Sequence, residues 1–137
     1  MQTQSFMVDV PGGQVFVQRW QPASATSGAA CPIVLLHESL GSVGQWHDFP
    51  ARLAQATGRE VLAYDRLGFG QSSPRSDAPS LQFIAHEAQQ HFPALVAALG
   101  LERYALLGHS VGAVMALHIA AAHPAQGPGG VQAQLPA

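Results

Sequence analysis

The segment Leu106–Gly112, LLGHSVG, places a polar dipeptide between two glycines. The apolar run Tyr104–Leu107 predicts a short buried strand, and Val111–Ala122 predicts an apolar helix that ends before Pro124. A strand that turns directly into a helix forces the residue at the bend into a strained backbone conformation, and small neighbours relieve the crowding there. The sequence therefore predicts a sharp bend that exposes Ser110.

The hydroxyl of Ser110 is placed for nucleophilic chemistry. It would lie at the start of a helix, where unsatisfied backbone N–H groups and the helix dipole favour developing negative charge. The N–H of Val111 is then a candidate donor to an oxyanion. The alternative is that Ser110 only caps the helix. The strand before it and the helix after it favour the nucleophile.

The remaining elements form an α/β pattern. Apolar stretches on both sides of Pro11–Gly13 predict a β-hairpin, and the segments beyond it alternate between short apolar runs and amphipathic stretches, one of them kinked or split at Pro93. The expected elements are hairpin strands Phe6–Val10 and Gln14–Gln18, buried strands Ile33–Leu36, Glu60–Asp65 and Tyr104–Leu107, and helices Trp46–Thr57, Leu81–Leu99 and Val111–Ala122. This order predicts a hairpin followed by three strand-helix units on a mainly parallel sheet.

The loop His37–Ser42, HESLGS, follows the first buried strand. A tetrahedral intermediate needs two donors to its oxygen, one from the residue after the nucleophile and one from a loop on the neighbouring strand. We expect the N–H of Ser39 to be the second donor. The alternative for His37 and Glu38 is that they only cap the strand end. A metal role has little support because further ligands at suitable spacing are missing.

The segment Tyr64–Ser72, YDRLGFGQS, opens a glycine-rich loop with an aspartate. Asp65 could be read as a catalytic acid, but an aspartate in this place usually ties down the backbone of its own turn. Gly68–Gly70 suggests a dinucleotide-binding motif, yet Ser73 stands where the third glycine belongs and no helix opens there. We therefore interpret Asp65 as structural and expect no cofactor.

Two histidine pairs imitate a zinc motif. His86 and His91 stand at positions i and i+5, whereas the zinc-protease motif needs i and i+4 on one helical face. On an α-helix the longer spacing separates two side chains by about 140°. His118 and His123 have the same spacing. We expect neither pair to hold a metal ion.

The composition argues against two classes of binding partner, nucleic acids and membranes. Charged residues make up 10% of the 137 residues, the net charge is −2, and the six arginines do not cluster, so we expect no nucleic acid partner. The longest apolar segment is well below the roughly 20 residues that span a bilayer, and no signal peptide is evident, so we expect no membrane association. Cys31 is alone, which fits a reducing cytoplasm, and the absence of Lys and Asn suggests a GC-rich bacterial gene.

Taken in order, HESLGS, DRLGFGQS and GHSVG make the chain resemble the α/β-hydrolase superfamily over roughly residues 5–124, close to its esterase, C–C hydrolase and cofactor-free haloperoxidase-like branches. The resemblance implies that Ser110 is the nucleophile and that Ser39 and Val111 form the oxyanion hole. It also implies acyl transfer to water without a cofactor, on a small-molecule ester, lactone or similar carbonyl substrate.

The sequence departs from the superfamily pattern in two places. Glu38 stands where many relatives have glycine after the histidine. The superfamily also places its acid and its general-base histidine well beyond the nucleophile helix, whereas this chain ends thirteen residues after Pro124. We consider His37 and His109 as supporting residues in their place, and expect little turnover without a base.

We expect a partial domain over residues 1–124 and a coil-like tail over 125–137, which has three glycines and two prolines where the next strand would be expected. Our hypothesis for the short end is a premature stop or frameshift near Ala125. The strand Tyr104–Leu107 would then have an open edge through which copies could self-associate. The alternative functions are a non-catalytic module that pairs through this edge and a nonfunctional fragment.

Overall fold

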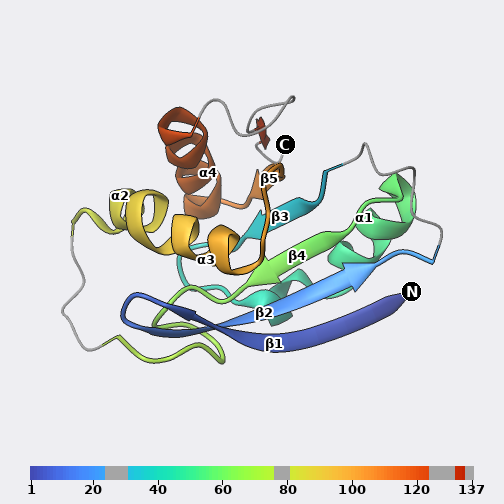
Figure 1. Ribbon diagram of the computed structural model, residues 1–137, viewed down its shortest axis with the longest axis horizontal. Helices are drawn as coiled ribbons and strands as arrows, with labels where there is room; N and C mark the ends of the chain where they lie inside the picture. The colour runs from blue at the N-terminus through green and yellow to red at the C-terminus, as the bar shows by residue number, and fades with distance from the viewer. Residues whose placement is uncertain (24–30, 76–80, 124–131, 135–137) are drawn as a thin grey trace.

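The computed structural model describes residues 1–23, 31–75, 81–123 and 132–134, and within them six strands form one sheet (Figure 1). The strands lie in the order β1-β2-β4-β3-β5-β6. Their bounds are Gln2–Val10 for β1, Gly13–Gln21 for β2, Ile33–Leu36 for β3, Val61–Tyr64 for β4, Ala105–Gly108 for β5 and Gln132–Gln134 for β6. Strands β4, β3, β5 and β6 run parallel, and β2 joins β4 antiparallel. The predicted α/β class with a mainly parallel sheet is confirmed.

The N-terminal hairpin is also confirmed, with longer strands than expected. β1 and β2 pair along their whole length, from Gln2 opposite Gln21 to Val10 opposite Gly13. The connection is the two-residue turn Pro11–Gly12. Gly12 has φ +95°, a backbone conformation that side chains disfavour, which explains a glycine at this turn.

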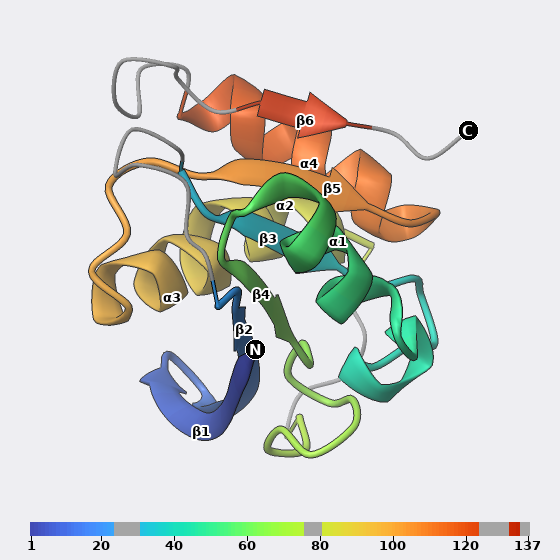
Figure 2. The same ribbon diagram turned by 90° about the vertical axis from the view of Figure 1, so that its right-hand side faces the viewer.

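Helices cover both faces of the sheet. Their bounds are Phe49–Thr57 for α1, Phe83–His86 for α2, Phe92–Ala98 for α3 and Val111–Ala122 for α4. Figure 2 shows α1 in front of the sheet and the other three helices behind it. Alternate residues of β3 point to opposite faces of the sheet. Ile33 and Leu35 pack in the cluster with α1, while Val34 and Leu36 pack in the cluster with α3 and α4.

The predicted helix Trp46–Thr57 is wrong at its start. A 3₁₀ turn over Val43–Trp46 comes first, and His47 has φ +53°, which no helix continues. α1 begins only at Phe49, with Pro50 in its first turn, where the missing N–H of a proline costs no hydrogen bond.

The predicted helix Leu81–Leu99 is divided as expected, but not at Pro93. Between α2 and α3 the chain forms a π-helical turn over Glu87–His91, and Pro93 lies in the first turn of α3. The α-helical angle assumed for His86 and His91 therefore does not apply to this stretch. Across residues 1–23, 31–75, 81–123 and 132–134, no three His, Cys, Asp or Glu side chains gather as metal ligands would.

The edge of β5 is not open. β6 pairs with it in parallel, with Leu106 opposite Ala133, so the expectation of an unpaired edge at β5 is wrong for these residues. β6 also shows that three residues of the predicted coil-like tail form a strand. The rest of that tail lies outside the described residues.

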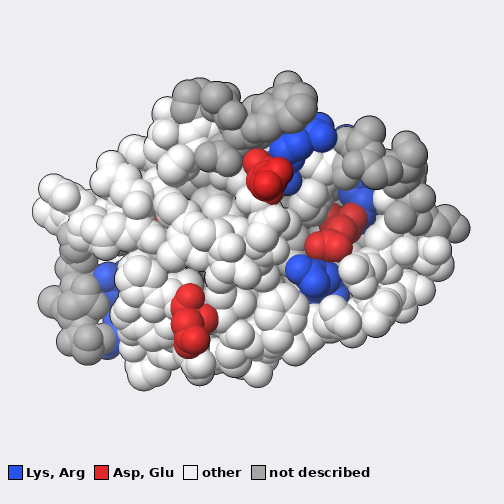
Figure 3. All heavy atoms as spheres, in the orientation of Figure 1, with Lys and Arg blue, Asp and Glu red and all other residues white. Residues whose placement is uncertain are grey.

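Charged side chains are sparse on the face shown in Figure 3, where some acidic and basic groups adjoin and others stand alone, and no large patch of one sign forms. None of the helices in the described ranges has the length and apolar character needed to cross a membrane.

We predict that Phe92→Ala lowers the free energy of unfolding by about 3–5 kcal/mol, because the ring is fully buried and lies edge-on to Tyr104 with centroids 5.3 Å apart. Urea unfolding at pH 7 measures the change. Phe83→Ala is the matched control, since that ring is 38% exposed and its loss is expected to cost clearly less. Equal losses for the two variants would contradict the assignment of Phe92 to the core.

Candidate active site

Ser110 occupies the sharp bend that the sequence predicts. It stands between the end of β5 at Gly108 and the start of α4 at Val111, with φ +59° and ψ −118°. A residue other than glycine rarely adopts this left-handed region, and such strain concentrates at functional sites. The Ser110 side chain is exposed, and no other described residue accepts or donates a hydrogen bond to its hydroxyl. The hydroxyl is thus presented to solvent rather than used as a helix cap.

The carbonyl oxygen of Leu36, at the end of β3, holds this bend against the sheet. The N–H of His109 donates to it at 3.0 Å. A Cβ atom at Gly112 would lie 2.1 Å from the same oxygen, and a Cβ at Gly108 would lie 2.2 Å from the carbonyl oxygen of Gly112. Both glycines are therefore required by contact between backbones.

The loops that follow β3 and β5 meet beside Ser110, because those strands are parallel neighbours. The order of the strands across the sheet also reverses at β3, since β4 lies on one side of it and β5 on the other. In parallel sheets such a reversal opens a crevice at the carboxyl ends of the strands. Ser39 lies in the first loop and Val111 follows the second strand. In the described part of the chain neither N–H donates a hydrogen bond.

His37 is not placed to act as a base. Its side chain is 2% exposed, Nε2 accepts the N–H of Arg66 at 3.0 Å, and Nδ1 lies 2.7 Å from the carbonyl oxygen of Glu38. Because a backbone N–H only donates, Nε2 carries no proton and Nδ1–H donates to Glu38. Burial, with a smaller effect of the Arg66 cation, lowers the pKa of His37 from 6.5 to about 4. The expectation that His37 supports Ser110 as a base is corrected to a structural role.

His109 borders a hollow of about 140 Å³ beside the bend. Its side chain is 56% exposed, and Nδ1 lies 3.7 Å from a carboxylate oxygen of Glu38. The ring of Trp46 lies edge-on to it, with centroids 6.3 Å apart. The hollow is lined by His37, Glu38, Ser42, Gln45, Trp46 and His109. The hollow adjoins His109, the residue that precedes Ser110.

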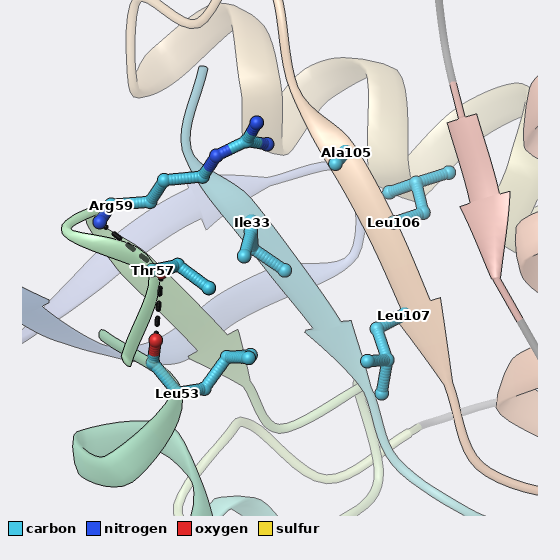
Figure 4. Close-up of a pocket in the computed structure, with 7 residues that line it drawn as sticks. All are labelled: Ile33, Leu53, Thr57, Arg59, Ala105, Leu106 and Leu107. Carbon is cyan, nitrogen blue, oxygen red and sulfur yellow. Dashed lines mark hydrogen bonds between the residues drawn. The ribbon is translucent and has the colours of Figure 1, made fainter. Parts of the chain in front are cut away.

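A second hollow, of about 370 Å³, lies away from this chemistry. Figure 4 shows it between the last turns of α1 and the sheet, bordered by Ile33 and Ala105. These are the first residues of β3 and β5, whereas Ser110 follows the other end of β5. The second hollow is therefore not part of the candidate active site.

Asp65 has the structural role that the sequence predicts. Its carboxylate accepts the N–H of Val43 at 2.6 Å and the N–H of Gln71 at 2.8 Å, and its side chain is buried. It thus joins the glycine-rich loop to the loop after β3. Gly70 must lie against this carboxylate, because a Cβ there would be 2.1 Å from Oδ2.

Arg66 is the residue that sequence reasoning missed. It is one of six scattered arginines in the sequence, yet it is 4% exposed and its guanidinium donates to the carbonyl oxygens of His37 and Glu38. Its position two residues after the end of β4 is only a weak signal of this role, because spacing does not tell which carbonyl oxygens a buried arginine reaches.

The chain is similar to several known proteins. The family described as alpha/beta hydrolase fold matches residues 32–132. A proline iminopeptidase from Lactobacillus delbrueckii subsp. lactis is 33% identical over 101 residues, which cover 72% of this chain and 34% of that protein. A 1-acylglycerol-3-phosphate O-acyltransferase from Homo sapiens is 37% identical over 100 residues, or 69% of this chain and 27% of that protein.

Among solved structures, a proline iminopeptidase from Mycobacterium smegmatis superposes with a TM-score of 0.73 at 33% identity, covering 93% of this chain and 41% of that one. A predicted CIB-like hydrolase from Thermoplasma acidophilum gives a TM-score of 0.75 at 24% identity, covering 92% and 59%. This chain spans about a third of the length of the curated relatives it matches.

We predict that Gly112→Ala destabilises the chain by about 3 kcal/mol, because the new methyl group would collide with the Leu36 carbonyl. Urea unfolding measures the loss. Gly44→Ala is the control, since the nearest atom to its Cβ would be 3.7 Å away, and we expect a change below about 0.5 kcal/mol. A Gly112→Ala variant as stable as the Gly44 variant would show that β3 and α4 are not in backbone contact.

We predict that His37 makes the chain less stable in acid. The unfolded chain binds a proton at His37 as pH falls through 6.5, whereas the folded chain resists until about pH 4, so stability is lost within this window. The loss is about 3 kcal/mol by pH 4. His37→Gln, which keeps an acceptor for the Arg66 N–H, should remove about this much of the pH dependence in urea unfolding. His118→Gln, at an exposed site, should not.

Proposed function

Because the chain belongs to the alpha/beta hydrolase fold family, we propose that it carries the acyl-transfer part of a serine hydrolase site, with Ser110 as nucleophile. The observation that carries the proposal is the exposed hydroxyl of Ser110, held in a left-handed bend at the start of α4. Strained backbone conformations of this kind cluster at active sites, and here the strained residue also carries an exposed hydroxyl. The first turn of a helix also offers its N–H groups and dipole to negative charge.

The proposed step is attack of Ser110 Oγ on a substrate carbonyl carbon. A bond forms between Oγ and carbon, the carbonyl electron pair moves onto oxygen, and a base takes the hydroxyl proton. The N–H groups of Ser39 and Val111 would donate to that oxygen, and such donors act most strongly where charge develops. The leaving group departs with the proton, and water then releases the acyl group from Ser110.

Neither His37 nor His109 is the base in this proposal, so the base has to be supplied from elsewhere. Both ring nitrogens of His37 already face backbone groups, and the ring of His109 contacts Glu38 and Trp46. In the superfamily that the chain resembles, the acid and the base follow the nucleophile helix. In other serine hydrolases, removal of triad members leaves a reaction rate about 10³–10⁴-fold above that in water. We expect a rate enhancement of this order from Ser110 and its two N–H donors alone.

The substrate class we propose is a small ester, lactone or similar carbonyl compound. The similar proteins are named as a peptidase, an acyltransferase and hydrolases, so they do not agree on one substrate. We also propose that the protein is cytoplasmic, because Cys31 is its single cysteine, and bacterial, because Lys and Asn are absent. We propose that it works without a cofactor.

We predict that a fluorophosphonate labels the 137-residue chain at Ser110, and that imidazole added as an external base raises the labelling rate. Peptide mass spectrometry after timed exposure locates and quantifies the adduct. Ser110→Ala should abolish it, whereas Ser42→Ala should leave it unchanged, because Ser42 offers another hydroxyl near the hollow without the bend. Absence of an adduct at Ser110 with imidazole present, or equal adducts on other serines, would overturn the proposed function.

A further inference from the structure

We infer that Arg66 is a positioning residue for the oxyanion hole, because its guanidinium fixes the peptide group that supplies the N–H of Ser39. This inference rests on the proposed function, in which that N–H receives the developing negative charge. Arg66 itself touches backbone oxygens and not the reacting atoms, so it acts through the loop His37–Ser42.

The guanidinium binds two successive carbonyl oxygens of this loop. Nη1 donates to the oxygen of His37 at 2.5 Å, and Nη2 donates to the oxygen of Glu38 at 2.6 Å. The planar fork of an arginine holds two acceptors in fixed directions, which the single ammonium of a lysine does not do. The loop is therefore fixed in orientation as well as in place.

The carbonyl of Glu38 and the N–H of Ser39 belong to one peptide group. A trans peptide is planar, and its C=O and N–H point in opposite directions. The Glu38 oxygen accepts from both Arg66 and the Nδ1–H of His37, so it faces the buried side of the loop and turns the Ser39 N–H away from it. Donation to a carbonyl oxygen also polarises the attached N–H, which strengthens its own hydrogen bond.

The backbone of Arg66 completes the connection. Its N–H donates to Nε2 of His37, which selects the tautomer whose Nδ1–H reaches the Glu38 oxygen. Three contacts from Arg66 and one from His37 thus act on the same short segment. The first residue beyond them is Ser39, whose N–H has no partner within the described chain.

The charge of Arg66 is held in a buried environment. Its guanidinium stands 5.3 Å from the ring centroid of Phe69, and the side chain is 4% exposed. The buried carboxylate of Glu87, which accepts the Tyr64 hydroxyl at 2.7 Å, supplies negative charge that favours the cation. Burying a cation costs desolvation free energy, so a contact between a buried guanidinium and backbone oxygens is a poor source of stability. Its result here is that the N–H group of Ser39 is oriented.

The test compares Arg66→Met and Arg66→Lys with the unsubstituted chain in fluorophosphonate inactivation with imidazole present. We expect the maximal inactivation rate to fall about tenfold to a hundredfold in Arg66→Met and less in Arg66→Lys, with the reagent concentration at half-maximal rate unchanged within twofold. Arg52→Met is the matched control, because Arg52 forms an exposed ion pair with Asp48. A folded Arg66→Met variant that keeps its maximal rate would overturn this inference and leave the proposed function intact.

A second readout does not depend on reactivity. The amide proton resonance of Ser39 should move upfield in Arg66→Lys, because the peptide loses part of its polarisation, while Arg52→Met should leave it in place. An unchanged Ser39 resonance in folded Arg66→Lys would overturn the inference even if Arg66→Met fails to fold. If the unsubstituted chain is not labelled at Ser110, the proposed function fails, and the inference fails with it.

Discussion

The carbonyl oxygen of Leu36 fixes the distance between the central strand and the bend that carries Ser110. It accepts the N–H of His109 and lies where any side chain at Gly112 would have to be. Because the two backbones touch, the chain has no room for a gradual turn between β5 and α4. The left-handed conformation of Ser110 follows from this contact. The site is thus a product of close packing between backbones before any side-chain chemistry is considered.

Burial of charge is the second feature of the site. The chain has few charged residues, yet Asp65, Arg66 and Glu87 are all buried. Asp65 and Arg66 bind the loops after β3 and β4, Asp65 through backbone N–H groups and Arg66 through carbonyl oxygens, while Glu87 accepts the hydroxyl of Tyr64 at the end of β4. Buried ions are poor sources of net stability. Their effect here is to define loop conformations that apolar packing alone would leave open.

Much of the architecture could be predicted from the sequence. The runs Ile33–Leu36 and Tyr104–Leu107 are apolar at every position because both faces of their strands are covered, and the glycines around Ser110 have no other use than close approach. The π-helical turn at Glu87 and the pairing of β6 could not be predicted, because they depend on what packs beside them. The role of Arg66 was hidden for the same reason, since its partners are backbone atoms of another loop.

The placement of the N-terminal hairpin affects how the chain folds. β1 and β2 join through a two-residue turn and can associate within microseconds. Their neighbour in the sheet is β4, with Val17 opposite Tyr64, and β4 is synthesised after β3 and α1. Ser72 and Ser73, which bind the backbone of Phe16 and Gln14, come later still. The hairpin therefore forms early but packs against the rest of the sheet late. Its partners are distant in sequence, and forming contacts between distant residues slows folding.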